Sequence, residues 1–367
     1  MNADRSTPAA GRARGLRMGT ALTAATLLAL TGCANPEGGG ANPGGTSGGG
    51  QQVTKTQDAG GAGCTLQQYG VEKLDLTKAT VGFSQSEKEA NPFRIAETAS
   101  ITAEAKRVGA RLITTNANSD LGKQISDIQS MLAQGAQLLI VAPLNSEGLE
   151  PALRAAREKK VPVITVDRKL SSAAPCKDYL TFIGSDFVDQ GKRAGEAMAK
   201  ATGGTGKVAI LLGSSGNNVT TDRTSGFKDY LKASAPGLQI VAEQTGDFAR
   251  EKGQQVTEQL LQANPGITAI YAQNDEMALG AVTAVRSAGK KPGQDIKIVS
   301  VDGTRNAVES IVAGDLNAVI ESNPRFGPLA FSTAQKFYAG ETITPTVIIQ
   351  DKSYDTANAK AEVANAY

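Results

Sequence analysis

Short apolar segments alternate with amphipathic segments over most of the chain. The apolar segments are typical of strands and lie at 80–83, 111–115, 137–141, 161–166, 179–184, 207–212, 238–243, 269–272, 296–301 and 316–320. The segments between them predict helices over 93–108, 121–132, 150–159, 189–201, 221–233, 250–263, 306–313 and 327–338, with a further helix from about 274. Apolar strands separated by single helices indicate parallel sheets that are covered on both faces.

The number of strand–helix units predicts two lobes, because one compact domain rarely holds so many. The fold class is α/β, with two Rossmann-like lobes that contain parallel sheets and are joined by a hinge. We expect the first lobe at 77–184 plus about 323–345, and the second at 185–322 plus about 346–367. The helix over 327–338 is expected to return to the first lobe.

The N-terminal residues are typical of a targeting segment. Basic residues within 12–17 precede an apolar run over 18–30, which is too short to span a bilayer well. The run ends in Leu-Thr-Gly-Cys, which resembles the lipobox of bacterial lipoproteins and implies that 1–33 is a signal peptide and that Cys33 is lipidated. An ordinary signal peptide with a chance cysteine is the alternative. The protein is expected outside the cytoplasm, on a lipid anchor in the cell membrane.

The next segment, 34–76, is expected to be a flexible tether, because residues 34–63 are rich in Gly, Asn, Pro, Ser and Gln. It is followed by two further cysteines, Cys64 and Cys176. In an exported protein such a pair indicates a disulfide, here closing a loop of 112 residues. Two free thiols are the alternative.

Composition excludes several kinds of chemistry. The 367 residues carry a net charge of +2 and include no His, no Trp and three Cys. The absence of His excludes Ser-His-Asp and Cys-His catalysis, and the cysteines form no zinc pattern, so we expect neither a metal nor a cofactor. The near-neutral charge is not that of a nucleic-acid-binding protein. Catalysis by paired carboxylates stays possible.

Polar and aromatic residues follow the predicted strands. Carboxylates, amides and Arg suit several hydrogen bonds to a polyhydroxylated ligand, and Phe offers a flat apolar face. Because ligands bind at the carboxyl ends of strands in such sheets, two facing rims would form a cleft for a small ligand. The candidates are Ser84, Gln85, Asn91, Phe93, Arg94, Asp167, Arg168, Phe248, Asn274, Asp302 and Ser322.

Several of these candidates have a purely structural alternative. Asn274 is well placed as a helix N-cap. Asp167 and Arg168 are possible partners in a loop ion pair, and Phe248 is a possible core residue. Arg94 is a possible solvated residue in a first helical turn, and Asp302 a possible turn residue.

Several motifs resemble those of the ribose/galactose class of periplasmic sugar-binding proteins, over about 79–350. They are Asn-Pro-Phe at 91–93, Val-Asp-Arg at 166–168, Gly-Asp-Phe-Ala-Arg at 246–250, Ala-Gln-Asn-Asp-Glu-Met-Ala-Leu-Gly at 272–280 and Val-Asp-Gly at 301–303. Within the class, 81–85, 92–94 and 300–303 look most like the galactofuranose-binding branch, in which Trp stands at the place of Phe93. The resemblance implies a monomeric solute-binding component of an ABC importer that binds a monosaccharide and is no enzyme. It adds Arg223 to the ligand-binding residues.

The mechanism that we expect is hinge closure around the ligand, with the closed form recognised by a membrane permease. The charged candidates nearly balance, with three arginines (Arg94, Arg168 and Arg223) and two aspartates (Asp167 and Asp302), and this balance favours a neutral sugar over an anion. The excess of one arginine is also compatible with a sugar acid. Three alternatives remain. A LacI-like repressor would carry an N-terminal helix-turn-helix where this chain has its lipobox. A lipoprotein that senses a sugar or autoinducer for a signalling receptor would have the same fold, and a glycosidase would need a close carboxylate pair.

Overall fold

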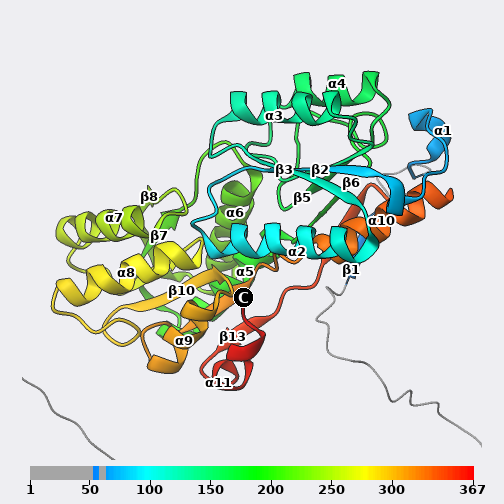
Figure 1. Cartoon of the computed structure of the whole chain (residues 1–367). Helices are drawn as coiled ribbons and strands as arrows, with labels where there is room; N and C mark the ends of the chain where they lie inside the picture. The colour runs from blue at the N-terminus through cyan, green and yellow to red at the C-terminus, as the bar shows by residue number, and fades with distance from the viewer. Residues whose placement is uncertain (1–52, 58–62) are drawn as a thin grey trace, which may run out of the picture. The chain divides into compact units, whose positions relative to one another are not determined.

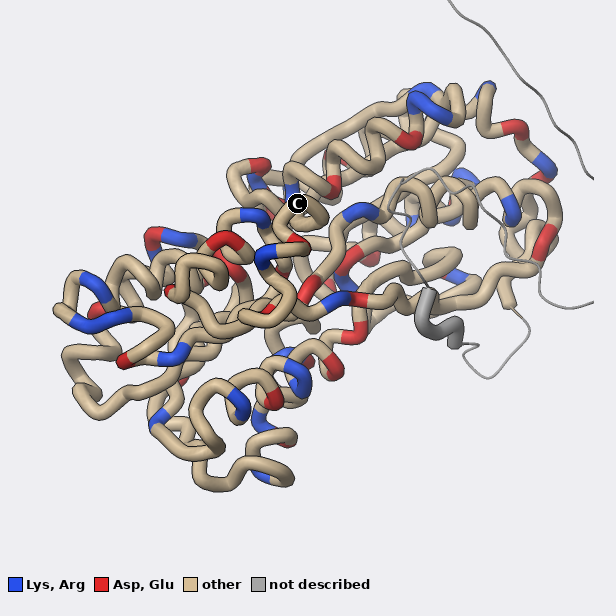
Figure 2. The backbone as a smooth tube through the Cα atoms, turned by 90° about the horizontal axis from the view of Figure 1, so that it is seen from below, with Lys and Arg blue, Asp and Glu red and all other residues tan. Residues whose placement is uncertain are grey.

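The computed structural model describes residues 53–57 and 63–367, which form two α/β lobes (Figure 1). The fold class predicted from the sequence is therefore confirmed. Among these described residues, no helix has the length and apolar character needed to cross a bilayer. Lys and Arg are interspersed with Asp and Glu along the described tube, in keeping with the small net charge (Figure 2).

The first lobe is built on a seven-stranded sheet with the order β1-β12-β6-β5-β4-β2-β3. Its neighbouring strands are parallel except for β1, which runs antiparallel to β12. The strands are β1 Val53–Gln57, β2 Thr80–Gln85, β3 Arg111–Asn116, β4 Leu138–Val141, β5 Val163–Val166, β6 Thr181–Gly184 and β12 Thr346–Ile349.

Helices cover both faces of this first sheet (Figure 1). On one side are α2 (Pro92–Val108) and α10 (Gly327–Ala339), and on the other α3 (Leu121–Ala133) and α4 (Glu150–Glu158). Strand β4 is apolar throughout because its side chains enter cores on both faces of the sheet. Ile140 joins the α2/α10 core, whereas Leu139 joins the α3/α4 core. The expected return of the helix 327–338 to this lobe is confirmed.

The second lobe is built on a six-stranded sheet with the order β13-β11-β10-β9-β7-β8, parallel except for β13. Its strands are β7 Thr205–Leu212, β8 Gly237–Thr245, β9 Ala269–Ala272, β10 Lys297–Asp302, β11 Ala318–Glu321 and β13 Ser353–Asp355. Its helices are α5 Phe187–Thr202, α6 Asn218–Ser234, α7 Arg250–Ala263, α8 Asp275–Ser287, α9 Arg305–Ala313 and α11 Ala359–Glu362.

The helices α5 and α6 approach each other closely because glycines face one another across their contact. A Cβ at Gly191 would lie 2.2 Å from the Arg223 carbonyl oxygen, and a Cβ at Gly226 would lie 2.0 Å from that of Val188. A larger residue at either position would push the helices apart. The contact matters for the ligand site because Arg223 lies on α6.

The N-terminal part of the described chain corrects the expected tether at 34–76. Residues 53–57 form strand β1, in which Val and Thr favour extended backbone, and they pair with β12. The chain then forms the short helix α1 (Leu66–Tyr69) and the turn η1 (Leu76–Lys78). Cys64 is buried and forms the expected disulfide with Cys176. Residues 34–52 and 58–62 lie outside the described residues.

The described chain passes between the two sheets three times, after β6, after β11 and after β12. Strand β12 belongs to the first sheet, so the last crossing follows Ile349 rather than residue 345. In that crossing the Asp351 carboxylate accepts hydrogen bonds from the Gln190 side chain (2.8 Å) and from the Asn323 backbone (3.2 Å). The second and third crossing segments are thus tied to each other and to helix α5.

Candidate ligand-binding site

An open cavity of about 320 Å³, a volume that includes the solvent at its mouth, lies where the carboxyl ends of strands from both sheets meet. Residues of both lobes line it, as the strand-end argument predicted. The lining residues are Glu87, Asn91, Phe93, Arg94, Asp167, Arg168, Val219, Arg223, Phe248, Asn274 and Asp302. Nine of the twelve sequence candidates are therefore brought together, and Glu87 and Val219 are additional.

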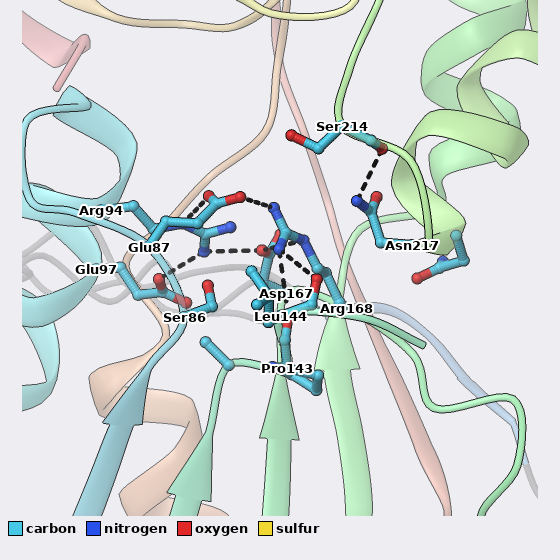
Figure 3. Close-up of polar contacts among 12 residues, drawn as sticks. Ser86, Glu87, Arg94, Glu97, Pro143, Leu144, Asp167, Arg168, Ser214 and Asn217 are labelled. Atoms are coloured by element: carbon cyan, nitrogen blue, oxygen red, sulfur yellow. Dashed lines mark hydrogen bonds and ion pairs between the residues drawn. The ribbon is translucent and has the colours of Figure 1, made fainter. Parts of the chain in front are cut away.

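Arg94, in the first turn of α2, is the centre of a buried ion cluster in the first lobe (Figure 3). Its Nη1 lies 2.8 Å from Oε2 of Glu97 and 2.8 Å from Oδ2 of Asp167, and its Nε lies 3.0 Å from Oε2 of Glu87. The alternative of a solvated residue is wrong for Arg94. Burial raises the pKa of Glu97, an effect that Arg94 opposes and Asp167 reinforces.

Arg168 lies beside this cluster and is fully buried. Its Nη2 lies 2.9 Å from Oε1 of Glu87, and its Nη1 donates to the Leu144 carbonyl oxygen at 2.8 Å. The neighbouring Asp167 adopts a left-handed backbone (φ 66°) directly after β5, and its Oδ2 lies 3.6 Å from the Arg168 Nε. Asp167 and Arg168 do form the loop ion pair considered as an alternative, and they line the cavity as well.

Glu87 was missed by the sequence argument. Its carboxylate bridges Arg94 and Arg168 (Figure 3). Burial alone would raise its pKa, but the two guanidinium groups outweigh burial and lower the pKa of Glu87 to about 2. The sequence feature that could have identified Glu87 is its position two residues after β2, in the same loop as Asn91.

Arg223 and Asp302 provide the charges of the second lobe. Arg223 donates through Nε to the Gln190 side chain (2.8 Å) and through Nη1 to the Gln273 carbonyl oxygen (2.6 Å). Its Nη2 lies 3.9 Å from Oδ1 of Asp302. Burial and the nearby Asp275 raise the pKa of Asp302 well above its ordinary value, against the influence of Arg223.

Hydrogen bonds to the Asp275 carboxylate hold the loop that carries Asp302 in place. The Asp275 carboxylate accepts hydrogen bonds from the Ser300 hydroxyl, from the backbone N–H groups of Gly303 and Thr304, and from the Thr304 hydroxyl, at 2.5–2.9 Å. Asp302 itself has a positive φ of 138°, which is unusual for a residue with a side chain. Asp275 therefore fixes a strained turn directly after β10.

Asn274 is the helix N-cap that its sequence suggested, and it also lies at the cavity. Its Oδ1 accepts the Met277 N–H at 3.0 Å as the N-cap of α8, and its Nδ2 donates to the Phe248 carbonyl oxygen at 3.1 Å. Asn274 nevertheless lines the cavity. Asn91 likewise caps α2 through the Phe93 N–H and lies in the lining.

Two aromatic rings form apolar walls. Phe93 packs against Tyr367 and Phe326, with ring centroids 6.2 Å and 6.4 Å away. Phe248 lies over Gly213, where a Cβ would come within 1.9 Å of the ring, so only glycine leaves it room. Phe248 also contacts both adjoining cores, yet it lines the cavity and is only partly buried.

Ser84, Gln85 and Ser322 lie outside this lining and have other partners. Ser84 accepts a hydrogen bond from Gln124, and the Gln85 side chain donates to Glu97 at 2.9 Å. Ser322 is buried at the second crossing, where its backbone N–H donates to the Asp302 carbonyl oxygen. The structure gives these three residues supporting contacts around the site.

The lining holds three guanidinium groups and three carboxyl groups, of Glu87, Asp167 and Asp302. With Glu87, the carboxyl groups of the lining equal the guanidinium groups in number. Within the part of the chain that the structure describes, no cluster of three or more Cys, Asp or Glu is arranged to hold a metal ion. The site offers hydrogen-bonding groups and apolar faces together, which suits a small polar ligand with an apolar face.

Comparison with known proteins defines the class. Residues 81–342 match the family described as the periplasmic binding protein domain. This range covers most of the two lobes, and the chain therefore belongs to the periplasmic binding protein family, whose members bind solutes and are not enzymes.

Individual relatives are more specific. The galactofuranose-binding protein YtfQ of Escherichia coli (strain K12) is 34% identical, over 77% of this chain and 90% of the relative. The ribose import binding protein RbsB of Bacillus subtilis (strain 168) is 36% identical, over 73% and 84%. A crystal structure from Mycobacterium smegmatis in complex with β-D-fucofuranose is 38% identical, covers 78% of this chain and 94% of that one, and has a TM-score of 0.75.

Proposed function

We propose that this chain is the extracytoplasmic solute-binding component of an ABC sugar importer, and that its ligand is a neutral monosaccharide. The observation that carries the proposal is the cavity between the lobes, with three guanidinium groups, three carboxyl groups and two aromatic walls. Guanidinium, carboxylate and amide groups would bind the hydroxyls, and Phe93 and Phe248 would contact the apolar face of the sugar ring.

Within the neutral sugars, we propose galactofuranose, a pentose or a related sugar in the furanose form. Support comes from two of the relatives above, one named for galactofuranose and the other seen with a fucofuranose. The ligand would contact both lobes at once, so it would bind the closed arrangement best and shift the population toward it. We further propose that the chain is a monomer, that a lipid at Cys33 holds it on the membrane, and that it delivers the sugar to a permease. Cys33 lies outside the described residues, and this part rests on the sequence.

Thermal unfolding of the full chain against a panel of sugars tests the ligand class. The panel contains L-arabinose, D-fucose, D-galactose, D-ribose and D-glucose, with D-galacturonate as an anionic comparison. A ligand at 100 times its Kd should stabilise the fold by about 2.7 kcal/mol.

The shift should disappear in Asp167→Asn, which replaces a carboxylate of the first lobe by an amide, and in Asn274→Ala, which removes an amide of the second lobe. Glu89→Gln is the control, because Glu89 is exposed and does not line the cavity. A shift with D-galacturonate and with none of the neutral sugars would contradict the proposal.

A further inference from the structure

The Phe93 ring, an apolar wall of the cavity, is in contact with three other groups. The Arg94 guanidinium lies 4.9 Å from its ring centroid, and the rings of Phe326 and Tyr367 pack against it at 6.4 Å and 6.2 Å. Tyr367 meets Phe93 nearly edge to face, at an interplanar angle of 78°, which is a favoured geometry for an aromatic pair. Arg94 and Phe326 belong to α2 and to the start of α10 in the first lobe, whereas Tyr367 follows β13 and α11 of the second.

The backbone of Tyr367 is fixed to the second lobe. Tyr367 follows the turn η2 (Val363–Asn365), and Ala366 before it is buried in the core of that lobe. The Tyr367 main-chain oxygen accepts the Arg305 N–H at the start of α9 at 2.7 Å, and the Tyr367 N–H donates to the Gly303 carbonyl oxygen at 3.4 Å. These bonds do not involve the side chain, so they are kept when the ring is replaced.

The Tyr367 side chain is held in place as well. Its hydroxyl donates to the Ser322 carbonyl oxygen at 3.3 Å in the second crossing, and the Arg325 guanidinium lies 5.7 Å from its ring centroid. Burial first, and the nearby Asp302 next, raise the pKa of the hydroxyl, so it stays a neutral donor. The ring packs against the first-lobe core that contains Phe93. The support of the Phe93 ring is therefore itself fixed.

We propose that Tyr367 is a positioning residue that holds the Phe93 ring in place at the ligand cavity. Tyr367 does not line the cavity, so it acts on the ligand through Phe93. A ring that is already ordered adds little cost to binding, whereas a mobile ring has to be ordered by the ligand. The statement about ligand affinity rests on the proposed sugar-binding function, and the statement about the order of the ring does not.

Three variants separate the ring from the rest of the residue. Tyr367→Ala removes the ring and keeps both backbone hydrogen bonds, and Tyr367→Leu is a milder form of the same change that should act in the same direction. Tyr367→Phe keeps the ring and removes only the hydroxyl bond to Ser322. Tyr230→Ala is the matched control, because Tyr230 is a partly buried tyrosine that packs over Gly195 in the second lobe and does not line the cavity.

The order of the Phe93 ring in the ligand-free full chain tests the positioning. NMR relaxation of ¹³C-labelled phenylalanine rings reports it as an order parameter. The order parameter of the Phe93 ring should fall in Tyr367→Ala and should be unchanged in Tyr367→Phe and in Tyr230→Ala. An equal order parameter in Tyr367→Ala and the unmodified chain, or a fall of the same size in Tyr230→Ala, would overturn the proposal.

Calorimetric titration with L-arabinose then tests the effect on the ligand. The Kd should rise about two- to twelvefold in Tyr367→Ala, the range for ordering one side chain on binding. In Tyr367→Phe and in Tyr230→Ala it should stay within about twofold of the unmodified chain, because both keep the ring beside Phe93.

A double-mutant cycle shows whether Tyr367 acts through Phe93. In a Phe93→Leu background, Tyr367→Ala should cause no further rise in the Kd, since the ring that it supports is gone. An equal rise with and without Phe93, or an unchanged Kd in Tyr367→Ala alone, would overturn the effect on the ligand. A loss of ring order without any binding of L-arabinose would support the positioning of Phe93 and count against a pentose ligand.

Discussion

Replacing Glu87 by Gln tests the electrostatic account of the site. Glu87 bridges Arg94 and Arg168, and its pKa is lowered from 4.5 to about 2 in the folded chain. A shift of this size corresponds to about 3 kcal/mol of stabilisation at pH 7, at 1.36 kcal/mol per pKa unit. Glu87→Gln keeps the shape of the side chain and removes its charge, so we expect a loss of that order in the free energy of unfolding.

The dependence on pH has a defined sign. Because the folded pKa of Glu87 lies below the unfolded one, its stabilising effect is present above pH 4.5 and is lost as the pH falls through about 2. The difference between the unmodified chain and Glu87→Gln should therefore shrink to less than half between pH 7 and pH 3. Urea denaturation at the two pH values measures it.

The ligand preference should change together with stability. Glu87→Gln leaves three arginines facing two carboxyl groups in the cavity lining, so binding of D-galacturonate should improve relative to L-arabinose. Glu89→Gln, the same substitution two residues further along at an exposed position, should change neither property. Equal unfolding free energies of Glu87→Gln and the unmodified chain at pH 7 would refute the reasoning.

Three further predictions concern the anchor, the disulfide and the aromatic wall. Cys33→Ala should move the protein from the membrane fraction to the soluble fraction, and continued membrane association would contradict the lipid anchor. Replacing Cys64 and Cys176 by Ser should lower the free energy of unfolding in urea by up to about 4.7 kcal/mol, the value for a loop of about 100 residues; a loss below about 1 kcal/mol would show that the bridge adds little. Gly213→Ala should displace the Phe248 ring and weaken sugar binding at least tenfold by calorimetry, and unchanged affinity would show that the ring is not a ligand contact.

Much of the fold could be predicted from the sequence, because strands and amphipathic helices place their apolar residues at different spacings along the chain. The strand 269–272 and the helix after Asn274 are examples. The pairing of β1 with β12 could not be predicted, since it joins short segments about 290 residues apart and no local pattern records the partner. The same holds for β13, a strand of three residues at the edge of the second sheet.

The site was predictable to the extent that strand ends define it. Asp167 and Asp302 directly end or follow a strand, and both lie in the cavity lining. Glu87 lies in a longer loop, and only its distance to two arginines from other segments distinguishes it from a solvated residue. Ser84 faces Gln124 rather than the cavity, a direction that follows from packing and not from its place at a strand end.

The contacts of the three arginines indicate which features of the site would determine the choice of sugar and which would determine the affinity. Arg94 and Arg168 bind carboxylates and carbonyl oxygens of the first lobe only, and Arg223 binds partners of the second lobe only. Each half of the site is therefore ordered before the lobes meet, and little free energy is needed to order its side chains on binding. Discrimination between sugars should then depend on where their hydroxyls meet these fixed groups. The overall affinity should depend on how readily the lobes close.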